Sequence, residues 1–142
     1  MARVNPYLTF NGNCEEAFTF YKSVFGGEWM MMKFKDVPPM PGMPDASAGN
    51  LVMHVSLPIS KETSLMASDV NPAMGPPVTM GQHLSISVAV DSKEEADKIF
   101  SGLSAGGKVT LPIQDMFWGA YFGMLVDKFG FIWMVNYDYP KP

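Results

Sequence analysis

An internal repeat with a fixed offset constrains the fold of this chain more than any other feature. Residues 5–27 (NPYLTFNGNCEEAFTFYKSVFGG) and 84–107 (LSISVAVDSKEEADKIFSGLSAGG) each lead from a β-like run through Glu-Glu-Ala into an amphipathic helix that stops at a glycine pair. Glu15 aligns with Glu94, an offset of 79 residues (15 to 94), and Gly27 aligns with Gly106. Two copies of one supersecondary unit bury their apolar faces together. The repeat therefore predicts two modules, with a ligand cleft between them.

Each copy has the pattern of one strand, one helix and three further strands. The predicted strands, from their alternation and turn signals, are 7–10, 28–34, 51–59 and 64–68 in the first copy, and 84–90, 109–114, 121–127 and 131–136 in the second. Asn13 is the expected N-cap of the first helix, and Ser92 or Asp91 that of the second. The segment 36–49 carries four prolines and predicts a long loop or lid.

The predicted fold class is therefore α+β, with two β-α-β-β-β modules that form curled, mostly antiparallel sheets around a cleft. Module boundaries fall at about residues 4–70 and 82–137, with a linker over 71–81, in a single domain of 142 residues. A chain of this length can bury a core without disulfides or metals.

Composition excludes several classes of function. The net charge is −4 without a basic run, so no electrostatic footprint for nucleic acid is present. No apolar stretch reaches the length of a membrane span, and the first residues lack a signal-peptide core, so we expect a cytoplasmic protein without a membrane partner. Only 17% of residues are charged, which leaves apolar surface for a second copy to cover and predicts a homodimer. Thirteen methionines indicate an adaptable apolar interior or pocket.

The single cysteine, Cys14, excludes an intramolecular disulfide and suits a reducing compartment. It lies at the predicted start of the first helix, where the helix dipole could lower its thiol pKa. The alternative is a small residue that only packs at the start of the helix.

A set of stretches that spans nearly the whole chain points to a known family: Pro6–Asn13, Ala17, Phe20-Tyr21, Leu65–Asp69, Phe117-Trp118-Gly119, Phe122-Gly123, Asp127–Gly130 and Trp133. Together they resemble the PhnB-like branch (also called demethylubiquinone methyltransferase-like) of the vicinal oxygen chelate superfamily. This superfamily contains glyoxalase I, bleomycin-resistance proteins and extradiol dioxygenases. The branch name suggests phosphonate metabolism or quinone methylation, but no S-adenosylmethionine motif is visible, which argues against a methyltransferase.

The resemblance implies a metal site that this chain does not reproduce. Enzymes of the superfamily hold a divalent metal on His and Glu side chains from the first and fourth strands of each module. Here the matching positions are Pro6 or Tyr7 in the first strand, Leu65-Met66-Ala67 in the fourth, and Met134 in the last. Only His83 lies near a ligand position, one or two residues too early, so we predict no metal and no cofactor.

The candidate site residues are few, and each has a structural alternative. His54 and His83 are candidate bases, although each could be a structural or surface histidine. Asp69 could bond a ligand or close a turn with Asn71-Pro72. Paired carboxylates such as Glu15-Glu16 recur at both helix starts and are assigned to helix stabilisation. The predicted ligand-binding residues are Tyr7, His54, Asp69, Trp118, Tyr121 and Trp133, of which the aromatic ones compete with core packing.

Three hypotheses follow. The first is a protein that binds a small, partly aromatic or apolar molecule in a metal-free cleft lined by methionine and aromatic side chains. The second is a metal-dependent lyase, isomerase or dioxygenase that uses His83, His54 and Asp69 in an unusual arrangement, which requires these side chains to converge. The third is a metal-free enzyme with His54 as its base.

Overall fold

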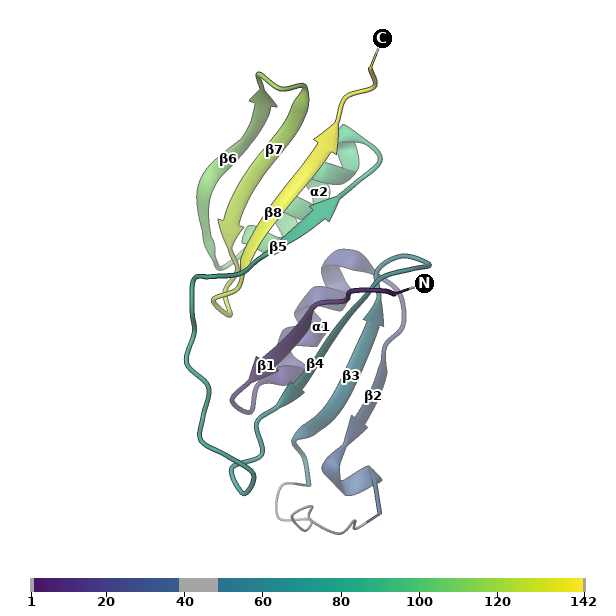
Figure 1. Ribbon diagram of the computed structural model, residues 1–142, viewed down its shortest axis with the longest axis vertical. Coiled ribbons are helices and arrows are strands. Elements are labelled where there is room, and N and C mark those ends of the chain that lie inside the picture. The colour runs from purple at the N-terminus through teal and green to yellow at the C-terminus, as the bar shows by residue number, and fades with distance from the viewer. Residues whose placement is uncertain (1, 39–48, 142) are drawn as a thin grey trace. The chain divides into compact units, whose positions relative to one another are not determined.

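The computed structural model describes residues 2–38 and 49–141, and internal contacts divide the chain into a first unit, residues 1–79, and a second unit, residues 80–142 (Figure 1). Each unit has the predicted order β-α-β-β-β. Residues 39–48 of the predicted loop or lid lie outside the described residues. Neither helix in the described parts of the chain has the length and apolar character needed to cross a membrane.

The first unit is a four-stranded mixed sheet with one α-helix. Its strands lie in the order β1-β4-β3-β2; β1 and β4 are parallel, and the other two pairs are antiparallel. The predicted strand over 28–34 is shorter in the structure: it begins at Met30 and ends at Lys33, where Asp36 Oδ2 accepts the Lys33 N–H at 3.0 Å and the chain turns into a 3-10 helix. The elements are β1 (Tyr7–Phe10), α1 (Cys14–Phe25), β2 (Met30–Lys33), η1 (Phe34–Asp36), β3 (Val52–Pro58) and β4 (Ser64–Asp69).

The second unit repeats this arrangement. Its sheet has the order β5-β8-β7-β6, with β5 and β8 parallel and the other two pairs antiparallel. The predicted α+β class with two modules is confirmed. The elements are β5 (Ser85–Ala89), α2 (Lys93–Ser104), β6 (Lys108–Met116), β7 (Ala120–Val126) and β8 (Ile132–Asp138).

The sequence repeat has an exact structural counterpart in the helices. Both contain 12 residues, and Cys14 and Lys93, their first residues, are separated by the same 79 positions (14 to 93). After each helix the aligned glycine has a left-handed backbone, with φ of 83° at Gly27 and 75° at Gly106. A residue with a side chain adopts this conformation only at a cost, which explains the glycine at both places.

The two helix starts are stabilised differently. Ser92 caps α2 as predicted, since its side chain accepts the Glu95 N–H at 3.1 Å. Asn13 is the N-cap residue of α1 as predicted, but its side chain makes no capping hydrogen bond. Instead Asp69, at the end of β4, accepts the N–H of Cys14 at 3.0 Å. A carboxylate 55 residues away in the chain thus takes the place of a local cap.

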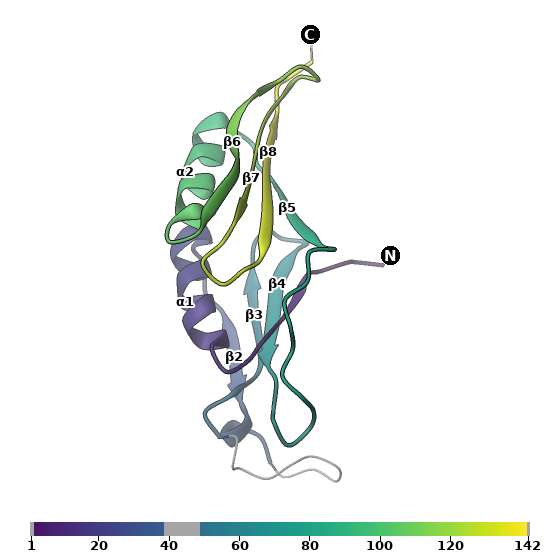
Figure 2. The same cartoon turned by 90° about the vertical axis from the view of Figure 1, so that its left-hand side faces the viewer.

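One face of each sheet packs against the helix of its own unit (Figure 2). In the first unit, Phe10 of β1 meets Phe18 of α1 edge to face, with ring centroids 6.3 Å apart. Val55 and Leu57 of β3 point to the same layer and are fully buried. Because side chains alternate along a strand, the residues between them point to the opposite face of the sheet.

Candidate functional site

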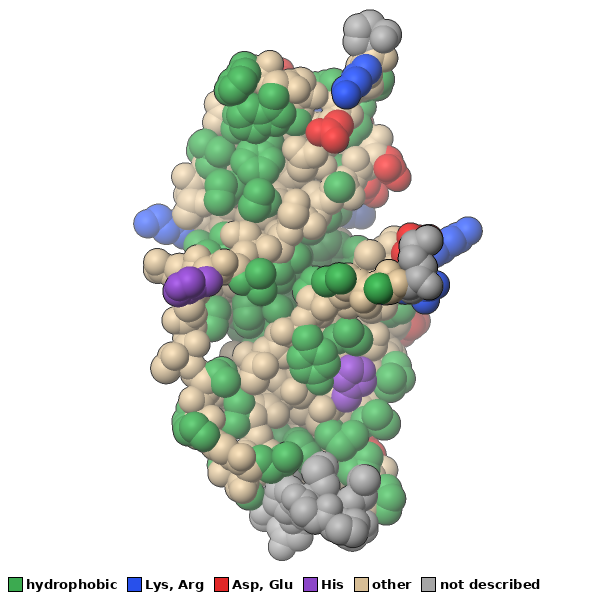
Figure 3. All heavy atoms as spheres, viewed as in Figure 1, with side chains coloured by type: hydrophobic (Ala, Val, Ile, Leu, Met, Phe, Trp, Pro, Cys, Tyr) green, Lys and Arg blue, Asp and Glu red, His purple; other side chains and the backbone are tan. Residues whose placement is uncertain are grey.

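The face of the first unit's sheet that points away from α1 is called the open face here. It carries alternate residues of the strands: Tyr7 and Thr9 of β1, Met66 and Ser68 of β4, and His54 and Ser56 of β3. Each of them keeps part of its surface exposed. Figure 3 views this face and shows apolar side chains spread over the strands. The open face therefore combines apolar side chains with a histidine, a phenol and three hydroxyls.

Two predicted site residues, Tyr7 and His54, meet on the open face. The Tyr7 hydroxyl lies 3.1 Å from His54 Nδ1, and the two rings stack with centroids 5.7 Å apart. This contact holds one nitrogen of the imidazole and orients the ring, which leaves Nε2 as the other position for proton exchange. The pair is the arrangement that a positioned acid or base requires.

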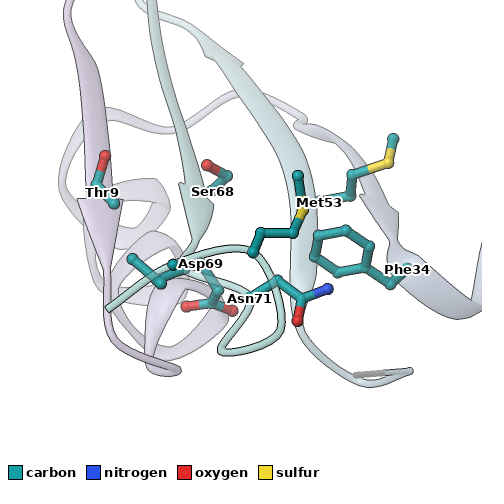
Figure 4. A pocket seen from close by; sticks show the side chains of 9 residues that line it. Thr9, Phe34, Met53, Ser68, Asp69 and Asn71 are labelled. Atoms are coloured by element: carbon teal, nitrogen blue, oxygen red, sulfur yellow. The ribbon is translucent and has the colours of Figure 1, made fainter. Parts of the chain in front are cut away.

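A pocket lies in the same unit, at the end where β1 and β4 finish. Its volume is about 310 Å³, and Phe34, Met53 and Met74 supply most of its apolar lining. Thr9 and Ser68, neighbours in the β1–β4 register, supply two hydroxyls. The full lining is Thr9, Phe34, Met53, Ser68, Asp69, Val70, Asn71, Met74 and Gly75 (Figure 4). A mostly apolar cavity with a few placed polar groups is the usual form of a small-molecule site.

Asn71 is the most unusual group in this lining. Its side chain is 4% exposed, and its Oδ1 accepts the Ala73 N–H at 3.0 Å. Its Nδ2 is buried and has no hydrogen-bond partner among the residues that the structure describes. Buried polar groups are nearly always hydrogen-bonded, so this donor needs an explanation. No signal for this role is present in the sequence, because Asn71-Pro72 has the composition of an ordinary turn.

Asp69 lines the same pocket, but its carboxylate serves the fold. Oδ1 accepts the N–H groups of Gly12 and Cys14, both at 3.0 Å, and Oδ2 accepts that of Val52 at 2.9 Å. The residue is 5% exposed. Asp69 thus joins the start of α1 to the start of β3, a structural role that the sequence did not indicate, and its role in ligand binding stays a prediction.

The other three predicted ligand-binding residues belong to the second unit, where protein groups already engage two of them. The Tyr121 hydroxyl donates to Asp97 of α2 at 2.5 Å, and this bond raises the pKa of Tyr121 to about 12. Trp133 is 1% exposed, and its Nε1 donates to Asp127 at 2.8 Å. Trp118 is 56% exposed in the turn between β6 and β7, where it packs on Phe122.

Asp127 stabilises the turn between β7 and β8. Its Oδ1 accepts the N–H groups of Phe129 and Phe131 at 2.8 and 3.1 Å, between β7 and β8.

Cys14 is fully buried, and this burial raises the pKa of its thiol; the nearby charges of Asp69 and Glu15 raise it further. The thiol is therefore a packing group rather than a nucleophile.

The positions that the resemblance assigns to metal ligands do not suit a divalent metal. Tyr7 and Met66 occupy them in β1 and β4, and Met134 occupies the last one in β8. Within residues 2–38 and 49–141, no three His, Cys, Asp or Glu side chains gather as a metal site. His83 is exposed ahead of β5, and Asp69 already accepts three backbone N–H groups. Thioether and phenol groups do not replace imidazole and carboxylate as ligands here.

Comparison with known proteins places this architecture in a family. The profile of the family described as 3-demethylubiquinone-9 3-methyltransferase matches residues 2–136. Protein YjdN of Escherichia coli strain K12 is 30% identical over 146 residues, which cover 98% of this chain and 97% of that protein.

Two solved structures extend the comparison to the fold. Protein PA1353 of Pseudomonas aeruginosa is 42% identical, with a TM-score of 0.84 over 97% of this chain and 98% of that chain. A Bacillus cereus PhnB protein, described as a putative 3-demethylubiquinone-9 3-methyltransferase, is 24% identical, with a TM-score of 0.71 over 96% and 99% of the two chains. The chain therefore belongs to the 3-demethylubiquinone-9 3-methyltransferase family.

Proposed function

We propose that this protein binds a small, partly apolar molecule in the pocket beside the open face of the first unit, without a metal ion. The observation that carries the proposal is the pocket itself, about 310 Å³ in volume, with thioether and phenyl groups on its walls and hydroxyls of Thr9 and Ser68 at its strands. Its volume falls at the lower end of the range of about 300–1,000 Å³ typical of ligand sites. Methionine side chains adapt to ligands of different shape, which suits a sequestering or sensing role.

The family description names a methyl transfer, but the residues favour binding. No S-adenosylmethionine motif is visible in the sequence, and none of the lining side chains is a histidine or a cysteine. The lining contains no lysine or arginine, and this lack of positive charge also favours a small, mostly apolar ligand. The pocket thus offers shape and hydrogen bonds rather than a reactive group.

Substitution of Ser68 tests the proposal. Ser68→Leu places an apolar side chain inside the pocket, so the affinity for fragments found by a thermal-shift screen should fall at least about tenfold, as measured by calorimetry. Ser56→Leu is the matched control, because Ser56 lies on the same open face and is half-buried but does not line the pocket. Equal affinities in the two variants and the wild type would place the fragments elsewhere and refute the proposal.

The Tyr7–His54 contact favours a second candidate function, metal-free catalysis with His54 as general acid or base. The phenol orients the imidazole at 3.1 Å, and both groups share the open face with Thr9 and Ser68 of the pocket lining. Any pocket ligand that is turned over should then react at least about 100-fold more slowly in His54→Gln, while its Kd stays within about threefold. His83→Gln, at an exposed position, is the control. An unchanged kcat in His54→Gln would exclude His54 as the acid or base and refute this second candidate.

We also propose that the protein works as a cytoplasmic homodimer. The low charged fraction of 17% supports a covered apolar surface, and the single cysteine supports a reducing compartment.

A further inference from the structure

We propose that the pocket selects neutral molecules that carry an oxygen acceptor of the carbonyl type, and that Asn71 Nδ2 recognises this oxygen. The inference rests on the proposed function, since it names the class of ligand that the same pocket would take. Asn71 Nδ2 is the one buried donor in the lining that has no hydrogen-bond partner among the described residues.

The orientation of the Asn71 amide follows from its turn. The Ala73 N–H needs an acceptor, and the amide end that lies 3.0 Å from it must be the oxygen. This assignment leaves Nδ2 as the free end. Figure 4 shows Asn71 between Asp69 and Phe34, with the amide nitrogen on the Phe34 side. The donor thus lies among the residues that form the wall of the pocket.

Burial makes this donor selective. A side chain that is 4% exposed has little access to bulk water, so the N–H groups of Nδ2 gain more from a ligand oxygen than an exposed amide would. A ligand without an acceptor would bury the donor completely and leave it unsatisfied. Sites built to hydrogen-bond a polar group reject analogues that lack it, for the same reason.

The charge of the lining restricts the ligand further. Asp69 is its single ionisable side chain, and no lysine or arginine accompanies it. An anionic ligand would approach this carboxylate without a cation to balance either charge, which is costly in a partly buried site. A cation gains little, because the Asp69 oxygens already accept three backbone N–H groups. The oxygen of a neutral ketone, ester or amide can accept the hydrogen bond of Asn71 Nδ2, and it brings no charge next to Asp69.

A matched pair of probes tests the inference. Acetophenone and α-methylstyrene have nearly the same shape, but only the first has a carbonyl oxygen. Protein labelled at its methionine methyl groups is titrated with each probe. The methyl groups of Met53 and Met74, which line the pocket, report binding and give both dissociation constants. We expect acetophenone to bind about tenfold more tightly to the wild type. Equal affinities would overturn the inference but leave the proposed function standing, whereas no response of either methyl group to either probe would refute both.

Substitution of Asn71 assigns the preference to its amide. Asn71→Asp keeps the shape and the acceptor for the Ala73 N–H but replaces the donor, so the preference for acetophenone should disappear. Asn71→Ser is the second variant, since a hydroxyl can also accept in such a turn and adds no charge beside Asp69. Loss of the preference in both variants supports the role of Asn71. A preference that persists in either folded variant would assign the selectivity to Thr9 or Ser68 and contradict the inference.

Discussion

Replacing Asp69 with alanine is expected to destabilise the first unit by about 3–4 kcal/mol, because three backbone donors lose their acceptor at once. The carboxylate is 5% exposed and accepts the N–H groups of Gly12, Cys14 and Val52 at 2.9 to 3.0 Å. The methyl group of alanine has no oxygen that could accept these N–H groups, and the start of α1 would lose its cap. Urea unfolding measures the loss, and hydrogen exchange at the three amides locates it.

Asp36→Ala is the matched control for this prediction. Asp36 also accepts a backbone N–H, that of Lys33, but it is exposed at the end of η1, where water can replace it. We expect a loss below about 1 kcal/mol in this variant. Similar stabilities for Asp69→Ala and Asp36→Ala would show that the buried carboxylate does not hold α1 and β3 together.

The second large effect is expected at Gly107, which follows α2. A Cβ atom at this position would lie 2.2 Å from the carbonyl oxygen of Val126 and 2.9 Å from the carbonyl carbon of Asp127. Both contacts are with backbone, so the end of β7 would have to move. Gly107→Ala should therefore cost about 3 kcal/mol of unfolding free energy in the second unit, measured by urea unfolding.

Gly75→Ala serves as the comparison, because a Cβ atom there meets nothing within 4 Å. Its stability should stay within about 0.5 kcal/mol of the wild type, or rise slightly through the reduced freedom of the unfolded chain. If Gly107→Ala is equally harmless, the approach of β7 to this glycine is looser than the structure indicates.

The fold was predictable because its signals are local and occur twice. The Glu-Glu-Ala motif, the glycine pair and the alternating strands each mark an element, and the second copy confirms the first at the same offset. What the sequence did not show is a long-range contact. Asn13 is the N-cap residue as its type predicts, but the buried carboxylate of Asp69, on β4, accepts the Cys14 N–H in place of the Asn13 side chain.

The candidate site was predictable only in part. Tyr7 and His54 could be chosen as site residues from their types, and the structure places them in contact. Trp133 and Tyr121 were chosen for the same reason, but aromatic side chains also serve the core, and here their polar atoms bond Asp127 and Asp97. Asn71 carries no sequence signal, because its importance comes from burial and from the orientation of a turn.

The structural and functional roles meet in one segment, residues 69–75. Asp69 anchors this segment to α1 and β3, and the Asn71 side chain then closes a turn that directs its amide nitrogen to the pocket wall. The scaffold and the binding group are thus only two residues apart. Since the scaffold sets the position of Asn71, loss of Asp69 should affect the pocket as well as the stability.

The most direct test of the central claim is to locate a bound fragment by intermolecular nuclear Overhauser effects to the methionine methyl groups. The claim that the first unit binds small apolar molecules predicts contacts from acetophenone to Met53 and Met74, which both line the pocket. Contacts only to methionines of the second unit, such as Met124 and Met134, or no contacts at saturating fragment, would contradict it.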